Sequence, residues 1–134
     1  MALPFEFLVP QRPLSLQARS RTNLRRWKDF VREQAKVTWF AEAVSEGPLA
    51  LTLVYLCGQD PADIDNIIKP IQDSLVGLVY ADDGLIADVD SHRRDLDDAI
   101  DITDLPELLQ RAVNIAEECV FVRIARGVPL KDYL

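Results

Sequence analysis

The chain has 134 residues, 49% of them apolar, which suits one globular domain with a single hydrophobic core. It contains no apolar run of the length that spans a membrane, and its first residues lack the basic and apolar regions of a secretory signal. We therefore expect a single domain over residues 1–134 that has no membrane partner and lies in the cytoplasm.

The charge of the chain is unevenly distributed, although its net value of −7 argues against a nucleic-acid partner. Residues 1–40 contain eight Lys or Arg and three Asp or Glu, a balance of 8 − 3 = +5. Residues 41–134 contain seven and nineteen, a balance of 7 − 19 = −12. A basic segment is thus available for phosphate contacts.

The small numbers of cysteines and histidines disfavour several kinds of catalytic and metal site. Cys57 and Cys119 lie in apolar runs and are too few for a disulfide framework, so we expect reduced, buried thiols. His92 is the single histidine, which disfavours a zinc site or a triad built on imidazole. We assign His92 no role and expect the chemistry to depend mostly on carboxylates.

The first part of the chain predicts strand, helix and strand. Residues 4–9 are aromatic and branched, which is typical of a strand. A helix is expected from about Thr22 to Val44, with Ser20 or Thr22 as N-cap and apolar side chains at helical spacing. Residues 49–57 form a nearly continuous apolar run, which predicts a strand in the middle of a sheet.

The middle of the chain predicts a helix and a strand. A helix over about 64–79 carries one apolar stripe that packs on the sheet, and an Asp-Gly turn follows it. Residues 85–93 alternate with period two, as in a strand. The alternation places Ile86, Asp88 and Asp90 on one face of that strand.

The last part of the chain predicts a helix and a strand. The spacing of Asp104 and Glu107 resembles a capping box, which marks the start of a helix. A final strand is expected over about 119–125, and residues 93–104 form a polar, acidic connection. The order β-α-β-α-β-α-β predicts an α/β or α+β domain with a mixed sheet.

Polar side chains are concentrated in residues 63–83. On the expected helix, Asp65, Lys69 and Asp73 recur every four residues and share one face, with Asn66 beside them. Such a grouping of acids around a lysine is a candidate for chemistry on a phosphate.

Carboxylates in this segment match the requirements of Mg²⁺, which takes oxygen ligands and is typically held by a few carboxylates together with water and phosphate. Asp63, Asp65 and Asp83 can supply such a set. Lys69 can neutralise charge on a phosphoryl oxygen, and a bound metal lowers the pKa of a water nucleophile. Together these features indicate phosphodiester hydrolysis.

An ordinary structural explanation also exists for each residue. Asp63 can cap the helix, the acids on either side of Lys69 can form i,i+4 pairs, and the turn around Asp83 is a common one. Pro70 favours the functional interpretation, because it removes a helical donor without an evident structural benefit.

The ordered set resembles the signature of the RusA-type Holliday junction resolvases, which reads D-x-D-N-x-x-K-P, then D-x-L and an Asp-Asp pair. Its members in this sequence are Asp63, Asp65, Asn66, Lys69, Pro70, Asp73, Leu75, Asp82 and Asp83. The resemblance continues through the flanking strands and the basic helix to about residue 95.

The resemblance implies an endonuclease that depends on Mg²⁺, with Mn²⁺ as an alternative, and resolves four-way DNA junctions as a homodimer by symmetric paired nicks. The catalytic residues it implies are Asp63, Asp65, Lys69 and Asp83. The metal ligands are Asp63, Asp65, Asp83 and Asp82. The supporting residues are Asn66 and Asp73.

A basic stripe on the first expected helix can track a phosphate backbone. Its members are Arg21, Arg25, Lys28, Arg32 and Lys36, which Arg19 and Arg26 extend. The alternative is a solvated helix face. Trp27 and Trp39, on the same segment, are more often core or dimer contacts than base-stacking groups.

Other functions are weaker matches to the sequence. The Tyr80–Asp83 segment is similar to the turn of reverse-transcriptase palms, but the chain is too short for that fold. Residues 88–99 begin like a calcium loop but lack its glycine and its final glutamate. The serious alternative is a non-catalytic DNA-binding or dimeric interaction module on the same fold.

Overall fold

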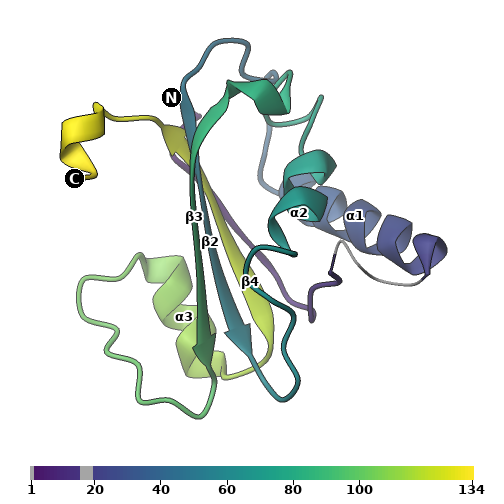
Figure 1. Cartoon of the computed structure of the whole chain (residues 1–134), viewed down its shortest axis with the longest axis vertical. Coiled ribbons are helices and arrows are strands. Elements are labelled where there is room, and N and C mark those ends of the chain that lie inside the picture. Colours follow the sequence, from purple (N-terminus) through teal and green to yellow (C-terminus); the bar gives the residue numbers. More distant parts are fainter. Residues whose placement is uncertain (1, 16–19) are drawn as a thin grey trace.

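The computed structural model describes residues 2–15 and 20–134 (Figure 1). Within these ranges strands and α-helices alternate, with two short 3-10 helices in addition. The elements are β1 (Phe5–Val9), α1 (Arg21–Lys36), β2 (Leu49–Cys57), α2 (Ile68–Ser74), a 3-10 helix (Asp83–Leu85), β3 (Ile86–Asp95), α3 (Glu107–Ile115), β4 (Cys119–Arg126) and a 3-10 helix (Leu130–Asp132). The expected α+β fold class is confirmed.

The strands form one mixed sheet in the order β1-β4-β2-β3. β2 is parallel to β3 and antiparallel to β4, and β4 is antiparallel to β1. β2 is therefore internal, as its apolar run predicted. β3 is an edge strand, and its exposed charged side chains suit an edge because they oppose pairing with another strand.

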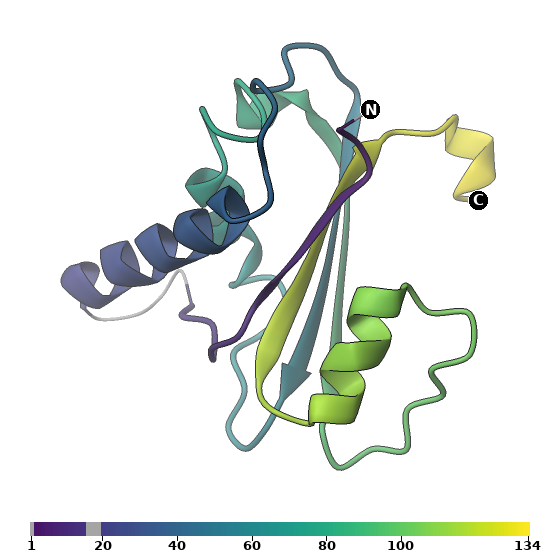
Figure 2. The ribbon, with the colours of Figure 1, turned by 180° about the vertical axis from the view of Figure 1, so that it is seen from behind.

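Helices cover both faces of the sheet (Figures 1 and 2). α1 and α2 lie on one face, over a main core that includes Leu51, Tyr55 and Val122. α3 lies on the opposite face, over a smaller cluster of Leu56, Ala112 and Cys119. No helix in the described part of the chain has the length and apolar character needed to cross a membrane.

α1 begins where the sequence predicted. Ser20 is its N-cap, and its Oγ accepts a hydrogen bond from the Asn23 N–H at 3.1 Å. The buried side chains of the helix are Trp27, Val31 and Ala35. Trp27 is thus a core residue, and so is Trp39, which is 5% exposed.

The predicted end of α1 near Val44 was wrong, because the helix stops at Lys36. The cause is tertiary. The Val44 N–H donates to the Val79 carbonyl at 2.8 Å, and the Ala81 N–H donates to the Val44 carbonyl at 2.9 Å. These bonds join Val44 to the segment after α2, which a continued helix would prevent.

α2 is much shorter than the helix predicted over 64–79. Pro70 lies in its first turn, where a missing N–H costs no intrahelical bond. An earlier start would require Pro70 to donate to the Asn66 carbonyl, which it cannot do. Gly77, with a φ of 80°, then reverses the chain soon after the helix ends.

β3 contains an irregularity that its alternating sequence did not predict. Leu49 pairs with Ile86, but the next residue, Ala50, pairs with Asp88, so one residue is inserted in β3. The prediction that Ile86 and Asp88 share a face was therefore wrong. Beyond the bulge, Asp88 and Asp90 lie on the α3 side of the sheet.

The predicted capping box at Asp104 was also wrong. α3 begins at Glu107 after Pro106, which makes no side-chain capping hydrogen bond, and Asp104 has a φ of 64°. Glu107 instead pairs with Arg111 at 2.7 Å, one turn along the helix. The first residues of the expected polar connection, Arg93–Asp95, belong to β3.

Candidate active site

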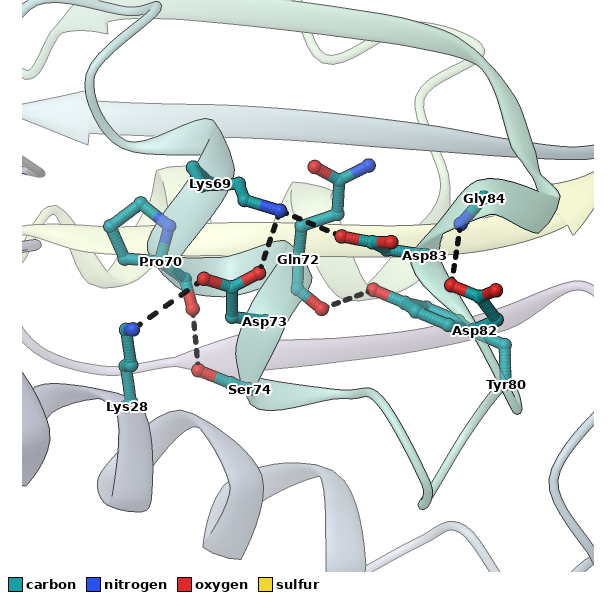
Figure 3. A network of polar contacts seen from close by, with 10 residues as sticks. All are labelled: Lys28, Lys69, Pro70, Gln72, Asp73, Ser74, Tyr80, Asp82, Asp83 and Gly84. Carbon is teal, nitrogen blue, oxygen red and sulfur yellow. Dashed lines mark hydrogen bonds and ion pairs between the residues drawn. The ribbon is translucent and has the colours of Figure 1, made fainter.

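Lys69 lies between two carboxylates (Figure 3). Its Nζ is 2.7 Å from Asp83 Oδ2 and 3.0 Å from Asp73 Oδ1. The other oxygen of Asp73 is 3.5 Å from Nζ of Lys28, on α1. Four charges of alternating sign, carried by three elements, thus form one connected group, which we call the lysine network: Lys28, Asp73, Lys69 and Asp83.

The ion pair between Lys69 and Asp83 favours the charged form of both side chains. The hydrogen bond from Lys69 lowers the pKa of Asp83, and the hydrogen bonds to Asp83 and Asp73 raise the pKa of Lys69. Both partners are charged at neutral pH. Lys69 is therefore suited to neutralise negative charge and unsuited to act as a general base.

Hydrogen bonds hold the turn that carries Asp83 against α2 (Figure 3). The buried Tyr80 donates from its hydroxyl to the Gln72 carbonyl at 2.5 Å. Asp82 Oδ1 accepts from the Gly84 N–H at 3.0 Å and is the N-cap of the short helix. The position of Asp83 relative to Lys69 is thus determined by Tyr80 and Asp82 rather than by the ion pair alone.

Asp63 and Asp65 lie in the segment before α2, which is anchored to the second half of β3. Ser91 Oγ donates to the Ile64 carbonyl at 3.0 Å, and Arg93 donates to the Ala62 carbonyl at 3.2 Å. Both acids are exposed and line a hollow of about 400 Å³. We call it the acidic hollow, and its other lining residues are Ile64, Ser91, His92, Arg93 and Arg94.

The predicted metal ligands do not converge into a closed site. Within the described ranges, no three His, Cys, Asp or Glu side chains form a group that could hold a metal ion. The donor chemistry fits Mg²⁺, because Asp63, Asp65 and Asp83 offer carboxylate oxygens at the surface and Mg²⁺ completes its shell with water and phosphate. Their roles as ligands, and that of Asp82, stay predictions.

The predicted supporting residues differ in what they do. Asp73 bridges Lys28 and Lys69, as described above. Asn66 contributes through its backbone, whose N–H donates to the Asp63 carbonyl at 3.1 Å and closes the turn before α2. The sequence indicated the pairing of Lys69 with Asp73 by helical spacing, whereas the contact with Asp83 depends on the tertiary fold.

Some cations of the basic stripe of α1 make contacts within the protein, and others are exposed. Arg32 donates to the carbonyls of Ser74 at 3.2 Å and Val76 at 2.8 Å, so it joins α1 to the end of α2. Arg21 and Arg25 are exposed.

The remaining cations of the stripe are Lys28, Lys36, Arg19 and Arg26, of which Arg26 is exposed. Lys28 belongs to the lysine network, and Lys36 pairs with Glu33 at 3.2 Å on the surface. Arg19 lies outside the described residues. Contact of the whole stripe with DNA stays a prediction.

Sequence reasoning missed the polar end of β3. His92 and Arg94 line the acidic hollow beside Asp63 and Asp65, and Arg93 anchors the segment that carries them. The run of one histidine and two arginines at a strand end was the available signal. Its proximity to the acids depends on the path of the chain between β2 and α2.

A comparison with models of protein families finds a match to the endodeoxyribonuclease RusA family over residues 11–103, more than half of the chain. The lysine network, the acidic hollow and the whole of the resolvase-like signature lie within the matched residues. No curated protein matches the chain. The extent of the family match, together with the signature it contains, shows that the chain belongs to the RusA family of Holliday junction resolvases.

Proposed function

We propose that this protein is a Mg²⁺-dependent endonuclease that resolves Holliday junctions by paired, symmetric nicks, with Mn²⁺ as an alternative metal. The observation that carries the proposal is the 2.7 Å ion pair of Lys69 and Asp83 within a RusA-family chain. It places a permanent cation beside a carboxylate at the surface, which is an arrangement suited to a phosphodiester substrate.

The residues that would hold the metal are Asp63, Asp65, Asp83 and Asp82. When bound, Mg²⁺ supplies positive charge for the phosphate and lowers the pKa of a water nucleophile. Lys69 then has a second task, because its ammonium group can leave Asp83 and donate to a phosphate oxygen. Asp73 keeps Lys69 near the site during that exchange, since it holds the same ammonium group from the other side.

DNA binding is assigned to the exposed cations of α1, with Arg21 and Arg25 as the principal phosphate contacts. A homodimer would present two such sites to two strands of a junction. We also propose a cytoplasmic location, which the free, buried thiols of Cys57 and Cys119 fit.

The proposal is tested by cleavage of a synthetic four-way junction beside matched duplex, flap and single-stranded DNA. Each reaction is run with Mg²⁺, with Mn²⁺ and with a chelator. Asp65→Asn removes one proposed ligand with almost no change in size. Asp132→Asn, in the short C-terminal helix, is the matched control because it makes the same change far along the chain from the acidic hollow.

We expect paired nicks in the junction alone, lost with the chelator and in Asp65→Asn but kept in Asp132→Asn. Cleavage that persists in the chelator would contradict the metal mechanism. Retardation of the junction without cleavage under any metal would favour the non-catalytic DNA-binding module instead.

A further inference from the structure

A second hollow lies on the other face of the sheet, between the strands, α3 and the connection before α3. Its volume is about 750 Å³, which is in the range of sites for small organic groups. Its floor is apolar and includes Val54, Leu56 and Phe121. We call this space the α3 cavity.

The α3 cavity meets the acidic hollow at the end of β3. His92 and Arg94 line both spaces. In the sheet, His92 pairs with Val54 and Arg94 with Leu56, so both side chains lie on the cavity face of an edge strand. A flexible polymer crossing this edge can therefore contact Asp63 and Asp65 on one side and enter the α3 cavity on the other.

The lining of the α3 cavity suits a nucleobase. The guanidinium carbon of Arg123 lies 5.8 Å from the centre of the Phe121 ring, and Glu6 holds this arginine through hydrogen bonds of 2.6 and 2.8 Å. Phe121 is 1% exposed and lies beneath the partly exposed Arg123, so the plane available to an unstacked base is the arginine guanidinium, a group on which bases stack. Asp98 and Asp101 also line the cavity, and carboxylates accept hydrogen bonds from base amino groups.

We propose that the α3 cavity receives one unstacked nucleobase of the DNA substrate, next to the phosphate cleaved at the acidic hollow. Arg94, which lines both spaces, binds the phosphate between them. The inference rests on the proposed nuclease function and adds a base-selecting site to it. Bases at a branch point cost less to unstack than bases inside a continuous duplex, so a junction can fill the cavity more readily than duplex DNA can.

The test places 2-aminopurine, a base analogue that brightens when unstacked, at each position around the cleavage site of a junction. Binding is followed by fluorescence in a chelator, so that no cleavage is needed for the readout. Ala99→Trp fills the cavity from an exposed position on its wall, and Arg94→Ala removes the shared cation. Arg111→Ala is the control, since Arg111 is an exposed arginine of α3 that does not line the cavity.

We expect one position to brighten with the wild-type protein and with Arg111→Ala, and to stay dark with Ala99→Trp. Arg94→Ala should weaken junction binding about tenfold through the loss of a phosphate contact and of support for the base. The base preference of cleavage at the brightened position should flatten in both cavity variants, provided that each melts as cooperatively as the wild type.

The inference is overturned if no position brightens in the wild-type complex with the chelator, although the same junction is cleaved when Mg²⁺ is added. It is also overturned if the base brightens with Ala99→Trp as it does with the wild type. A change of oligomer mass in that variant would then indicate that the cavity accommodates protein rather than DNA. Failure of the proposed function gives a different result, namely a bright base and full affinity without cleavage under any metal.

Discussion

The positive charge of Lys69 is paired with two carboxylates, those of Asp83 and Asp73. Asp83 lies at 2.7 Å and Asp73 at 3.0 Å, and the side chain of Lys69 is 49% exposed. Water screens pairs of this exposure, so their contribution to folding is small. Under the proposed function, the network holds a cation in place beside the carboxylates that would bind the metal.

Removal of the Lys69 charge should raise the pKa of Asp83. The hydrogen bond from Lys69 keeps that pKa below its ordinary value of 3.8. The folded-state pKa is depressed, so the pair's contribution to stability is present above the unfolded pKa and is lost as the pH falls through the folded pKa. In Lys69→Met, carboxyl NMR titration should show the Asp83 pKa moving up toward 3.8.

Asp101 is the internal control for this titration. Its pKa is lowered by hydrogen bonds from Thr103, which Lys69 does not touch, and it should stay unchanged in Lys69→Met. An unchanged Asp83 pKa would mean that the ion pair does not form in solution.

Asp73 should act as a positioning residue for Lys69. Asp73→Asn removes the charge that holds both Lys28 and Lys69, so the ammonium group of Lys69 loses one of its two anchors. We expect kcat for junction cleavage to fall about tenfold or more, because small misplacements of a catalytic group are costly, with little change in KM. Steady-state kinetics over a range of junction concentrations measure both constants.

Glu33→Gln is the matched comparison for Asp73→Asn, since Glu33 pairs with the surface residue Lys36. Its kcat should equal that of the wild type. If Asp73→Asn raises KM and leaves kcat unchanged, Asp73 affects DNA binding and not the position of Lys69.

The elements that could be predicted are those whose sequence signals are local. Residues 49–57 gave a strand with the observed bounds because an unbroken apolar run describes a strand covered on both faces. The N-cap at Ser20 depends on residues within one turn. The end of α1 depends on Val44 pairing with residues more than thirty positions away, which no window around Val44 contains.

In the candidate site, too, the contacts that could be predicted are those that depend on local sequence. The pair of Lys69 and Asp73 follows from helical spacing, and the motif order indicated that Asp83 belongs with them. The position of Asp63 and Asp65 beside His92 and Arg94 depends on how the loop after β2 returns to β3. The bulge in β3 also changes the face of the sheet on which His92 lies. Strict alternation would place His92 on the same face as Ile86, whereas it lies on the opposite one.

Arg32 and Arg25 should separate the structural and DNA-binding tasks of α1. Arg32 donates to two carbonyls at the end of α2, so Arg32→Ala should lower the free energy of unfolding by about 1–3 kcal/mol, measured with urea. Arg25 is exposed, and Arg25→Ala should change stability by less than about 0.5 kcal/mol.

DNA binding should show the opposite pattern. Arg25→Ala should weaken junction binding and reduce the slope of log affinity against log salt by about 1, as expected for one lost phosphate contact. Arg32→Ala, measured at a temperature where it is fully folded, should keep the wild-type slope. An unaltered slope in Arg25→Ala would make α1 a solvated face.

Basic residues are concentrated in the first 40 residues of the chain, and the two faces of the sheet are covered by different helices. The net charge is −7, yet the first 40 residues, which include the exposed cations of α1, contain eight Lys or Arg and three Asp or Glu, a balance of 8 − 3 = +5. α1 and α2 lie on one face of the sheet and α3 on the other, and β3 forms the edge where the acidic hollow and the α3 cavity meet. Under the proposed function, this distribution of charge favours the approach of DNA to α1 and disfavours its approach to the acidic rest of the chain.

Paired nicking should require two intact protomers. If each protomer of the proposed homodimer cuts one strand, a dimer of one wild-type and one Asp65→Asn protomer can make a single cut.

Differently tagged chains, co-expressed and purified through both tags, isolate such mixed dimers. A supercoiled plasmid with an extruded cruciform separates the results, because one cut gives a nicked circle and two cuts across the junction give a linear product. Mixed dimers should yield nicked circles, and the wild type should yield linear DNA. Linear product from mixed dimers in the wild-type proportion would mean that one protomer cuts both strands in turn, and the symmetric mechanism would have to be abandoned.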